Sequence, residues 1–167
     1  MGLNNLIGNK RAPYIGITPE EYETSFLGLP SETEVKKISK NPRNAYGTWY
    51  ERTILCQLKK ICDKKDWSYK PQVSMGYSTV YLKNRIVDVV VNERLGLEMK
   101  YLKGDGSLVK PKSLIDALDF TVRPIDSIYL IDGPGWLKSK NIEYLNEWWT
   151  FTNSANLENS LKRYFEK

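Results

Sequence analysis

The segment RIVDVVVNERLGLEMKY, residues 85–101, contains two apolar runs separated by a short tip at residues 92–94. Each run has the length and composition of a buried strand, so the segment predicts a hairpin. The first run nevertheless carries Asp88, and the second carries Glu98 and Lys100. Because apolar side chains would fill a sheet interior at a lower cost in free energy, these charges indicate a functional site.

The length of the tip fixes the register of the predicted hairpin. If the tip is three residues long, Val91 pairs with Leu95. Counting outward from that pair places Asp88 directly opposite Glu98, with Cβ atoms about 5 Å apart. Lys100 lies two residues beyond Glu98 and therefore shares this face, at about 7 Å. A slip of one residue would separate these charges onto opposite faces.

The predicted pairing of two acids is stable only if a proton or a cation lies between them. Opposed carboxylates away from water repel each other, and one or two carboxylates commonly hold Mg²⁺, so we expect Mg²⁺ at Asp88 and Glu98. Lys100 would then hold or deprotonate a water, or stabilise charge on a phosphate. Glu51 heads the apolar stripe of an earlier helix and is expected to face the sheet, as a further ligand or as the partner of Lys100.

A structural interpretation of the same charges stays open. A Glu-x-Lys pattern on a strand is common and usually lies on a solvated face. In that interpretation Asp88 forms an ion pair with Arg85 and contributes only to stability. The β-branched residues around Asp88, and the position of Glu51 on an apolar stripe, favour the functional interpretation.

The composition limits the classes of chemistry. The chain has no histidine, which excludes Ser-His-Asp and Cys-His catalysis and His-ligated zinc. A net charge of +5 favours an anionic partner such as nucleic acid, although a basic protein without such a partner fits it as well. No apolar run approaches the roughly 20 residues of a membrane helix. Cys56 and Cys62 fall on different faces of one expected helix, which argues against a disulfide and for a reducing cytoplasm.

The order of elements predicts the fold class. Capping boxes predict helices over 18–28 and 31–40, and a 3.6-residue period predicts a helix over 46–63. Strands follow over 67–75 and 78–82, on either side of a turn at Gly76, and over both runs of the hairpin. A helix over 113–122, a strand over 127–132 and helices over 141–151 and 156–167 complete the order. This order indicates an α/β or α+β protein with a mixed sheet. We expect one domain over 1–167, with a helical extension (1–45), a core (46–133) and C-terminal helices (134–167).

Together these residues resemble the PD-(D/E)xK nuclease superfamily. The likeness consists of helical Glu51, then Asp88, then Glu98-Met99-Lys100, within the element order helix, strand, strand, strand, helix, strand. That superfamily includes most type II restriction endonucleases, some homing endonucleases and archaeal junction resolvases. Val87 stands where the motif's name has proline, so the likeness depends more on the element order than on the letters.

The resemblance implies a restriction-endonuclease-like core and a Mg²⁺-dependent, sequence-specific endonuclease that cuts double-stranded DNA and leaves 5′-phosphates. Within the superfamily the chain most resembles a type II restriction enzyme, which implies that a prokaryote, a phage or a mobile element encodes it. Asp88, Glu98 and the Met99 carbonyl would hold Mg²⁺, Lys100 would position the attacking water, and Glu51 would be the auxiliary acid. A homing endonuclease, a Holliday junction resolvase, a repair nuclease and a non-catalytic DNA-binding protein on the same scaffold remain alternatives.

Two basic segments flank the candidate core. Arg43 and Asn44 precede the helix of Glu51 and are candidates for contacts to phosphate or a base edge. Lys103, Lys110 and Lys112 follow the second strand of the hairpin and are candidates for the DNA backbone, with a solvated basic loop as the alternative. Because cutting both strands of a palindrome requires two active sites related by a two-fold axis, we expect a homodimer.

Overall fold

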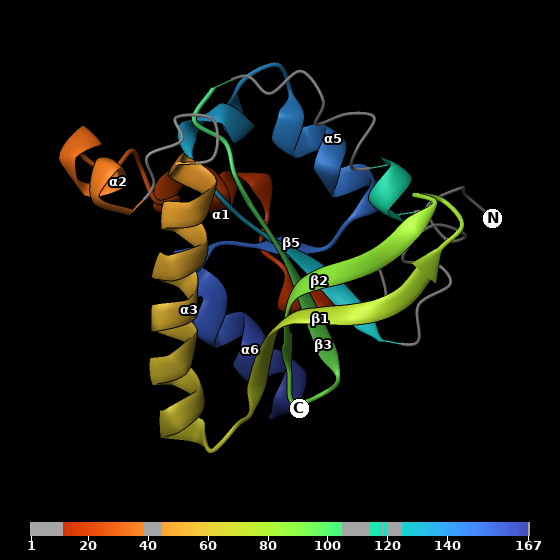
Figure 1. Cartoon of the computed structure of the whole chain (residues 1–167). Coiled ribbons are helices and arrows are strands. Elements are labelled where there is room, and N and C mark those ends of the chain that lie inside the picture. The colour runs from red at the N-terminus through yellow and green to blue at the C-terminus, as the bar shows by residue number, and fades with distance from the viewer. Residues whose placement is uncertain (1–11, 39–44, 105–113, 118, 120–124, 167) are drawn as a thin grey trace.

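Within the described residues, five strands form one mixed sheet in the order β1-β2-β3-β4-β5, with helices on both faces (Figure 1). The structure is a computed structural model and describes residues 12–38, 45–104, 114–117, 119 and 125–166. β2 pairs antiparallel with β1 and β3, whereas β4 pairs in parallel with β3 and β5. The predicted α+β class is confirmed. The strands are β1 (Tyr69–Ser78), β2 (Lys83–Val91), β3 (Leu95–Tyr101), β4 (Asp126–Asp132) and β5 (Phe151–Thr152).

Alternating side chains of the strands separate two apolar layers. Val89, Leu97 and Leu130 pack with helices α3 and α6, while Tyr129 and Ile131 pack on the other face with α1 and α5. None of the helices in the described part of the chain combines the length and the apolar character needed to cross a membrane. The helices are α1 (Pro19–Ser25), α2 (Glu32–Ile38), α3 (Ala45–Lys65), α5 (Asn141–Trp148) and α6 (Leu157–Phe165), with 3₁₀ turns η2 (Pro13–Ile15), η3 (Pro134–Leu137) and η4 (Ser154–Asn156).

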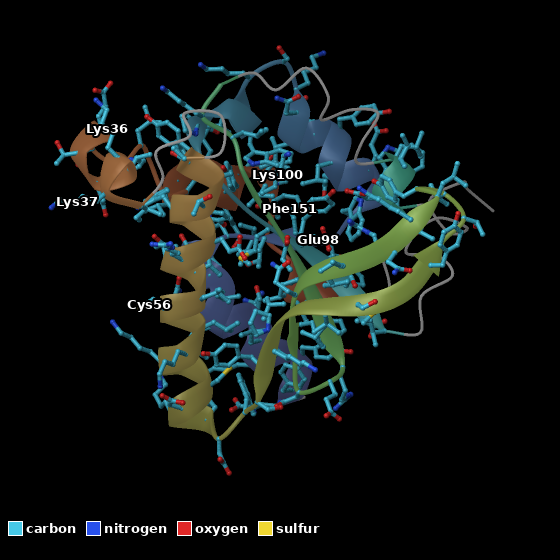
Figure 2. All side chains as sticks on the ribbon, in the orientation of Figure 1. Lys36, Lys37, Cys56, Glu98, Lys100 and Phe151 are labelled. Atoms are coloured by element: carbon cyan, nitrogen blue, oxygen red, sulfur yellow. The ribbon has the colours of Figure 1, made fainter. Side chains whose placement is uncertain are left out.

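Helix α3 carries the apolar stripe that the sequence predicts. Ile54 and Leu58 are fully buried against the sheet, and Glu51, one turn earlier, is half-buried. Cys56 lies on the outer side of the helix (Figure 2). Cys62 is buried, and both thiols are free. The stripe therefore fixes which face of α3 is turned toward the strands and brings Glu51 close to them.

A buried carboxylate at the end of β4 holds α3 in place through a hydrogen bond. Asp132 accepts hydrogen bonds from the Leu27 N–H (2.6 Å), the Tyr50 hydroxyl (2.8 Å) and the Ser154 N–H (3.0 Å). Burial raises the pKa of Asp132, and these hydrogen bonds, which favour the charged form, offset part of that rise. Because Tyr50 precedes Glu51, this contact helps to fix the position of Glu51.

The sequence prediction is wrong around the turn between β1 and β2. The predicted strand over 78–82 is not formed: Ser78 ends β1, and residues 79–82 form the turn, in which Leu82 has a φ of 57° and its N–H donates to the Ser78 carbonyl at 2.8 Å. The turn predicted at Gly76 is also wrong, because β1 continues through it. Gly76 has a φ of 84° and lies where the register of β1 against β2 shifts, so it accommodates an irregularity within a strand.

The predicted helix over 141–151 is too long. Helix α5 ends at Trp148, and Phe151 and Thr152 form strand β5 beside Tyr129 and Leu130. Phe151 is buried in the layer that contains α5. A strand of two residues is too short to show an alternation of apolar and polar residues in the sequence. The burial of Phe151 beside β4 therefore determines the local conformation.

Replacing Gly135 with alanine should lower the free energy of unfolding by about 3 kcal/mol, the upper end of overpacking costs. The Gly135 N–H donates to the Leu102 carbonyl at 2.9 Å, and a Cβ at this position would collide with the backbone carbonyl of Gly104. Gly28→Ala is the matched control, because nothing lies within 4 Å of its added Cβ, and it should stay within about 0.5 kcal/mol of wild type. Urea unfolding of both variants tests this, and equal stabilities would contradict it.

Candidate active site

The hairpin of β2 and β3 has the predicted register. Val91 pairs with Leu95, and the described pairing continues as far as Val89 and Leu97. Beyond that pair, the Asp88 side chain takes part in the contact between the strands: its Oδ2 accepts a hydrogen bond from the Met99 backbone N–H at 2.7 Å. A carboxylate that accepts a backbone N–H is held by a strong, charge-assisted hydrogen bond. Asp88 is thus fixed where the regular pairing of β2 and β3 ends.

One cleft, of about 610 Å³, collects three of the four residues predicted to be catalytic. Glu51 comes from α3, Asp88 from β2 and Lys100 from β3. Met99 lines the cleft as well, as does Lys103, whose Nζ lies 4.7 Å from the ring centroid of a neighbouring tyrosine, Tyr46. The cleft therefore combines two carboxylates, two ammonium groups and an aromatic wall.

Glu98 does not line this cleft, although it lies on the same strand as Lys100 (Figure 2). Its Oε2 lies 3.1 Å from Nη2 of Arg85, and its side chain is only 10% exposed. The same guanidinium lies 3.5 Å from Asp116 and 3.1 Å from Asp119. The structure thus places Glu98 in a buried ion cluster, made of Arg85, Glu98, Asp116 and Asp119.

The buried ion cluster is hydrogen-bonded on several sides. Asp116 accepts hydrogen bonds from the hydroxyls of Tyr81 and Tyr129, and Ser78 donates to Asp119 at 2.5 Å. Burial alone would lower the pKa of Arg85, but the charges of its carboxylate partners raise it above its ordinary value. Arg85 therefore stays charged and joins the β1–β2 turn to β3 and to the helical residues 114–117 and 119.

Sequence reasoning missed Gln72, whose amide Nε2 donates to Oε1 of Glu51 at 3.0 Å. It also missed Asp116 and Asp119 as partners of Arg85. The spacing of these two acids by three residues, within a predicted helix, was an available signal that they share one face. Nothing in the local sequence marks Gln72.

The donor set of the cleft fits Mg²⁺ through two carboxylates. Among the residues that the structure describes, no group of three or more acidic or cysteine side chains is placed to hold a metal ion. Mg²⁺ is usually bound through one or two carboxylates and keeps several waters. Glu51 and Asp88 supply that number of carboxylates on the wall of an open cleft.

The structure bears on one of the predicted DNA contacts. Lys103 is exposed in the cleft, where an ammonium group could meet a phosphate. The other four predicted contacts lie outside the described residues: Arg43, Asn44, Lys110 and Lys112.

Comparison of the chain with protein-family models, with curated proteins and with solved structures gave no match. The resemblance to the PD-(D/E)xK superfamily therefore depends on the sequence pattern alone.

Proposed function

We propose that this chain is a Mg²⁺-dependent endonuclease of double-stranded DNA. The observation that carries the proposal is the position of Asp88, held by the Met99 N–H at the end of the β2–β3 pairing and facing the same cleft as Glu51 and Lys100. Two carboxylates in one open cleft can hold a divalent metal, and a lysine beside them can stabilise the charge that develops when a phosphodiester is hydrolysed.

Each cleft residue has a distinct part in the proposed reaction. Asp88 and Glu51 would hold Mg²⁺, which supplies a Lewis acid for the phosphate and a more acidic water. Lys100 orients the attacking water and stabilises the negative charge that develops on the phosphate. Glu98 is paired with Arg85 and does not line the cleft, so Glu51 has the larger part in holding the ion.

The substrate follows from charge and from the resemblance. The net charge of +5 and the exposed Lys103 favour a polyanion in the cleft. Sequence specificity, 5′-phosphate products, a homodimer and a restriction role all come from the likeness to type II restriction enzymes. Homing, junction-resolving and repair nucleases would use the same cleft on different DNA.

Incubation of the purified protein with phage-sized DNA should give discrete fragments in Mg²⁺ and no cleavage with a chelator. The fragments should carry 5′-phosphates that a ligase can rejoin. Glu51→Gln should slow cleavage, whereas Asp63→Asn, which removes an exposed carboxylate outside the cleft, should not. A smear would indicate a non-specific nuclease, and cutting of branched DNA alone a resolvase. No cleavage of any of these DNAs in Mg²⁺ or Mn²⁺ would refute the proposal.

A second candidate is a non-catalytic DNA-binding protein. The ion pair between Arg85 and Glu98 favours it, because that pair neutralises one acid of the nuclease-like motif. This candidate predicts DNA binding that does not depend on a divalent ion and is unaffected by Glu51→Gln. Electrophoretic mobility shifts with and without Mg²⁺ separate it from the nuclease.

A further inference from the structure

Gln72 has an unusual backbone conformation in the middle of strand β1. Its φ is 53°, in the left-handed region that favours glycine. The neighbouring pairs Pro71–Val89 and Val73–Val87 belong to the regular ladder, whereas the position between them, Gln72 opposite Asp88, is left out of it. Such a conformation costs free energy and persists where other contacts enforce it, often at functional sites.

The side chain of Gln72 crosses from the edge strand to helix α3. Its Nε2 donates to Glu51 Oε1 at 3.0 Å, between residues 21 positions apart in the sequence. Gln72 is exposed, so the need to satisfy a buried polar group does not explain this contact. An irregular residue in an edge strand can, however, redirect a side chain toward a neighbouring site.

Glu51 and Glu98, two acids of the motif, are bonded by different kinds of donor. Glu98 is paired with the positive guanidinium of Arg85, which neutralises its charge. Glu51 is bound by a neutral amide, which orients one oxygen and leaves the negative charge in place. A carboxylate that is oriented but not neutralised suits a divalent cation.

We propose that Gln72 is a positioning residue that orients the Glu51 carboxylate toward a divalent cation in the cleft. This inference rests on the proposed function, because it assigns Glu51 to the metal. It adds a residue from β1 to a site otherwise built from α3, β2 and β3. Gln72 acts through Glu51 and contacts neither the metal nor the DNA.

A double-mutant cycle tests this proposal directly. Mn²⁺ affinity, by calorimetry, and the rate of DNA cleavage are measured for wild type, Gln72→Ala, Glu51→Gln and the double variant. Gln72→Ala should weaken Mn²⁺ binding by about 10-fold to 100-fold, as the loss of a residue that orients a metal ligand does. The double variant should bind no more weakly than Glu51→Gln alone. Additive losses would overturn the proposal, because they would mean that Gln72 does not act through Glu51.

Two further variants separate positioning from folding. Gln72→Gly accepts the left-handed backbone without the side chain, so it should melt no lower than wild type and still lose Mn²⁺ affinity. Gln57→Ala removes another amide from α3, one that donates to the Ser154 carbonyl at 2.7 Å, and it should leave Mn²⁺ affinity unchanged. Wild-type affinity in Gln72→Gly would overturn the inference.

Failure of the inference is distinct from failure of the proposed function. If wild type binds Mn²⁺ and cuts DNA while Gln72→Ala equals it in both, the positioning role alone is wrong. If wild type neither binds Mn²⁺ nor cuts DNA, the proposed function and the inference are both wrong.

Discussion

Arg85→Leu should lower the free energy of unfolding by about 3–5 kcal/mol, the cost of leaving buried charges without their partner. The Arg85 side chain is 14% exposed, and the side chains of Glu98, Asp116 and Asp119 are 10%, 1% and 1% exposed. Removing the guanidinium leaves these acids in a weakly solvated region without the cation that they share. For a chain of this size the loss corresponds to a fall in melting temperature of about 6–20 °C, measurable by circular dichroism.

Arg94→Leu is the matched control for that substitution. Arg94 is exposed, and its guanidinium lies over the rings of Tyr164 and Phe165, at 5.6 and 5.9 Å from their centroids. Its removal should cost only about 1 kcal/mol, the value of an exposed cation–π contact. If Arg85→Leu is no more destabilising than Arg94→Leu, the prediction is wrong. Water rather than Arg85 would then stabilise the charges of the carboxylates in the buried ion cluster.

The register of the β2–β3 hairpin was predictable because local geometry determines it. Asn92 and Glu93 have φ values of 50° and 58°, and the Arg94 N–H donates to the Val91 carbonyl at 3.1 Å. A three-residue tip of this kind leaves Val91 beside Leu95 and sets the pairs that follow as far as Val89 and Leu97. The strand pattern of the sequence therefore predicts that Asp88 lies beside β3, where its side chain accepts the Met99 N–H.

The surroundings of Glu98 were not predictable in the same way. Sequence reasoning continued an ideal pleat past the last described pair, Val89 and Leu97, and so placed Asp88 and Glu98 around one ion. In the structure Glu98 instead meets Arg85, from 13 residues earlier in the chain. Arg85 also bonds to Asp119, 34 residues away. Such contacts depend on how separate elements pack together, which no local pattern encodes.

Gln72 shows a second limit of local patterns. A left-handed glutamine inside a strand contradicts its intrinsic preference, so sequence reasoning assigns it an ordinary strand position. Its contact with Glu51 joins β1 to α3 and so depends on how this helix packs against the sheet. Departures from local preference of this kind are expected at functional sites, where several contacts together enforce an unfavourable backbone.

Lys100→Ala should reduce the rate of DNA cleavage by about 100-fold to 1000-fold, the usual cost of losing a group that stabilises transition-state charge. Lys100 is half-buried, and its carbonyl accepts a hydrogen bond from the Trp136 indole at 3.4 Å, a backbone contact that alanine keeps. The fold should therefore survive the substitution. Single-turnover cleavage at saturating DNA, together with a melting curve, measures both effects.

Lys103→Ala is the control that separates catalysis from attraction of the polyanion. Lys103 lies in the same cleft but is exposed, with its ammonium group over Tyr46. Its loss should weaken DNA binding and reduce the slope of log affinity against log salt concentration by about 1, the value for one phosphate contact. The cleavage rate at saturating DNA should stay the same. Lys100→Ala should show the reverse pattern. If both variants lower affinity alone, the two lysines only bind DNA, and the cleft loses the cation on which the hydrolytic role depends.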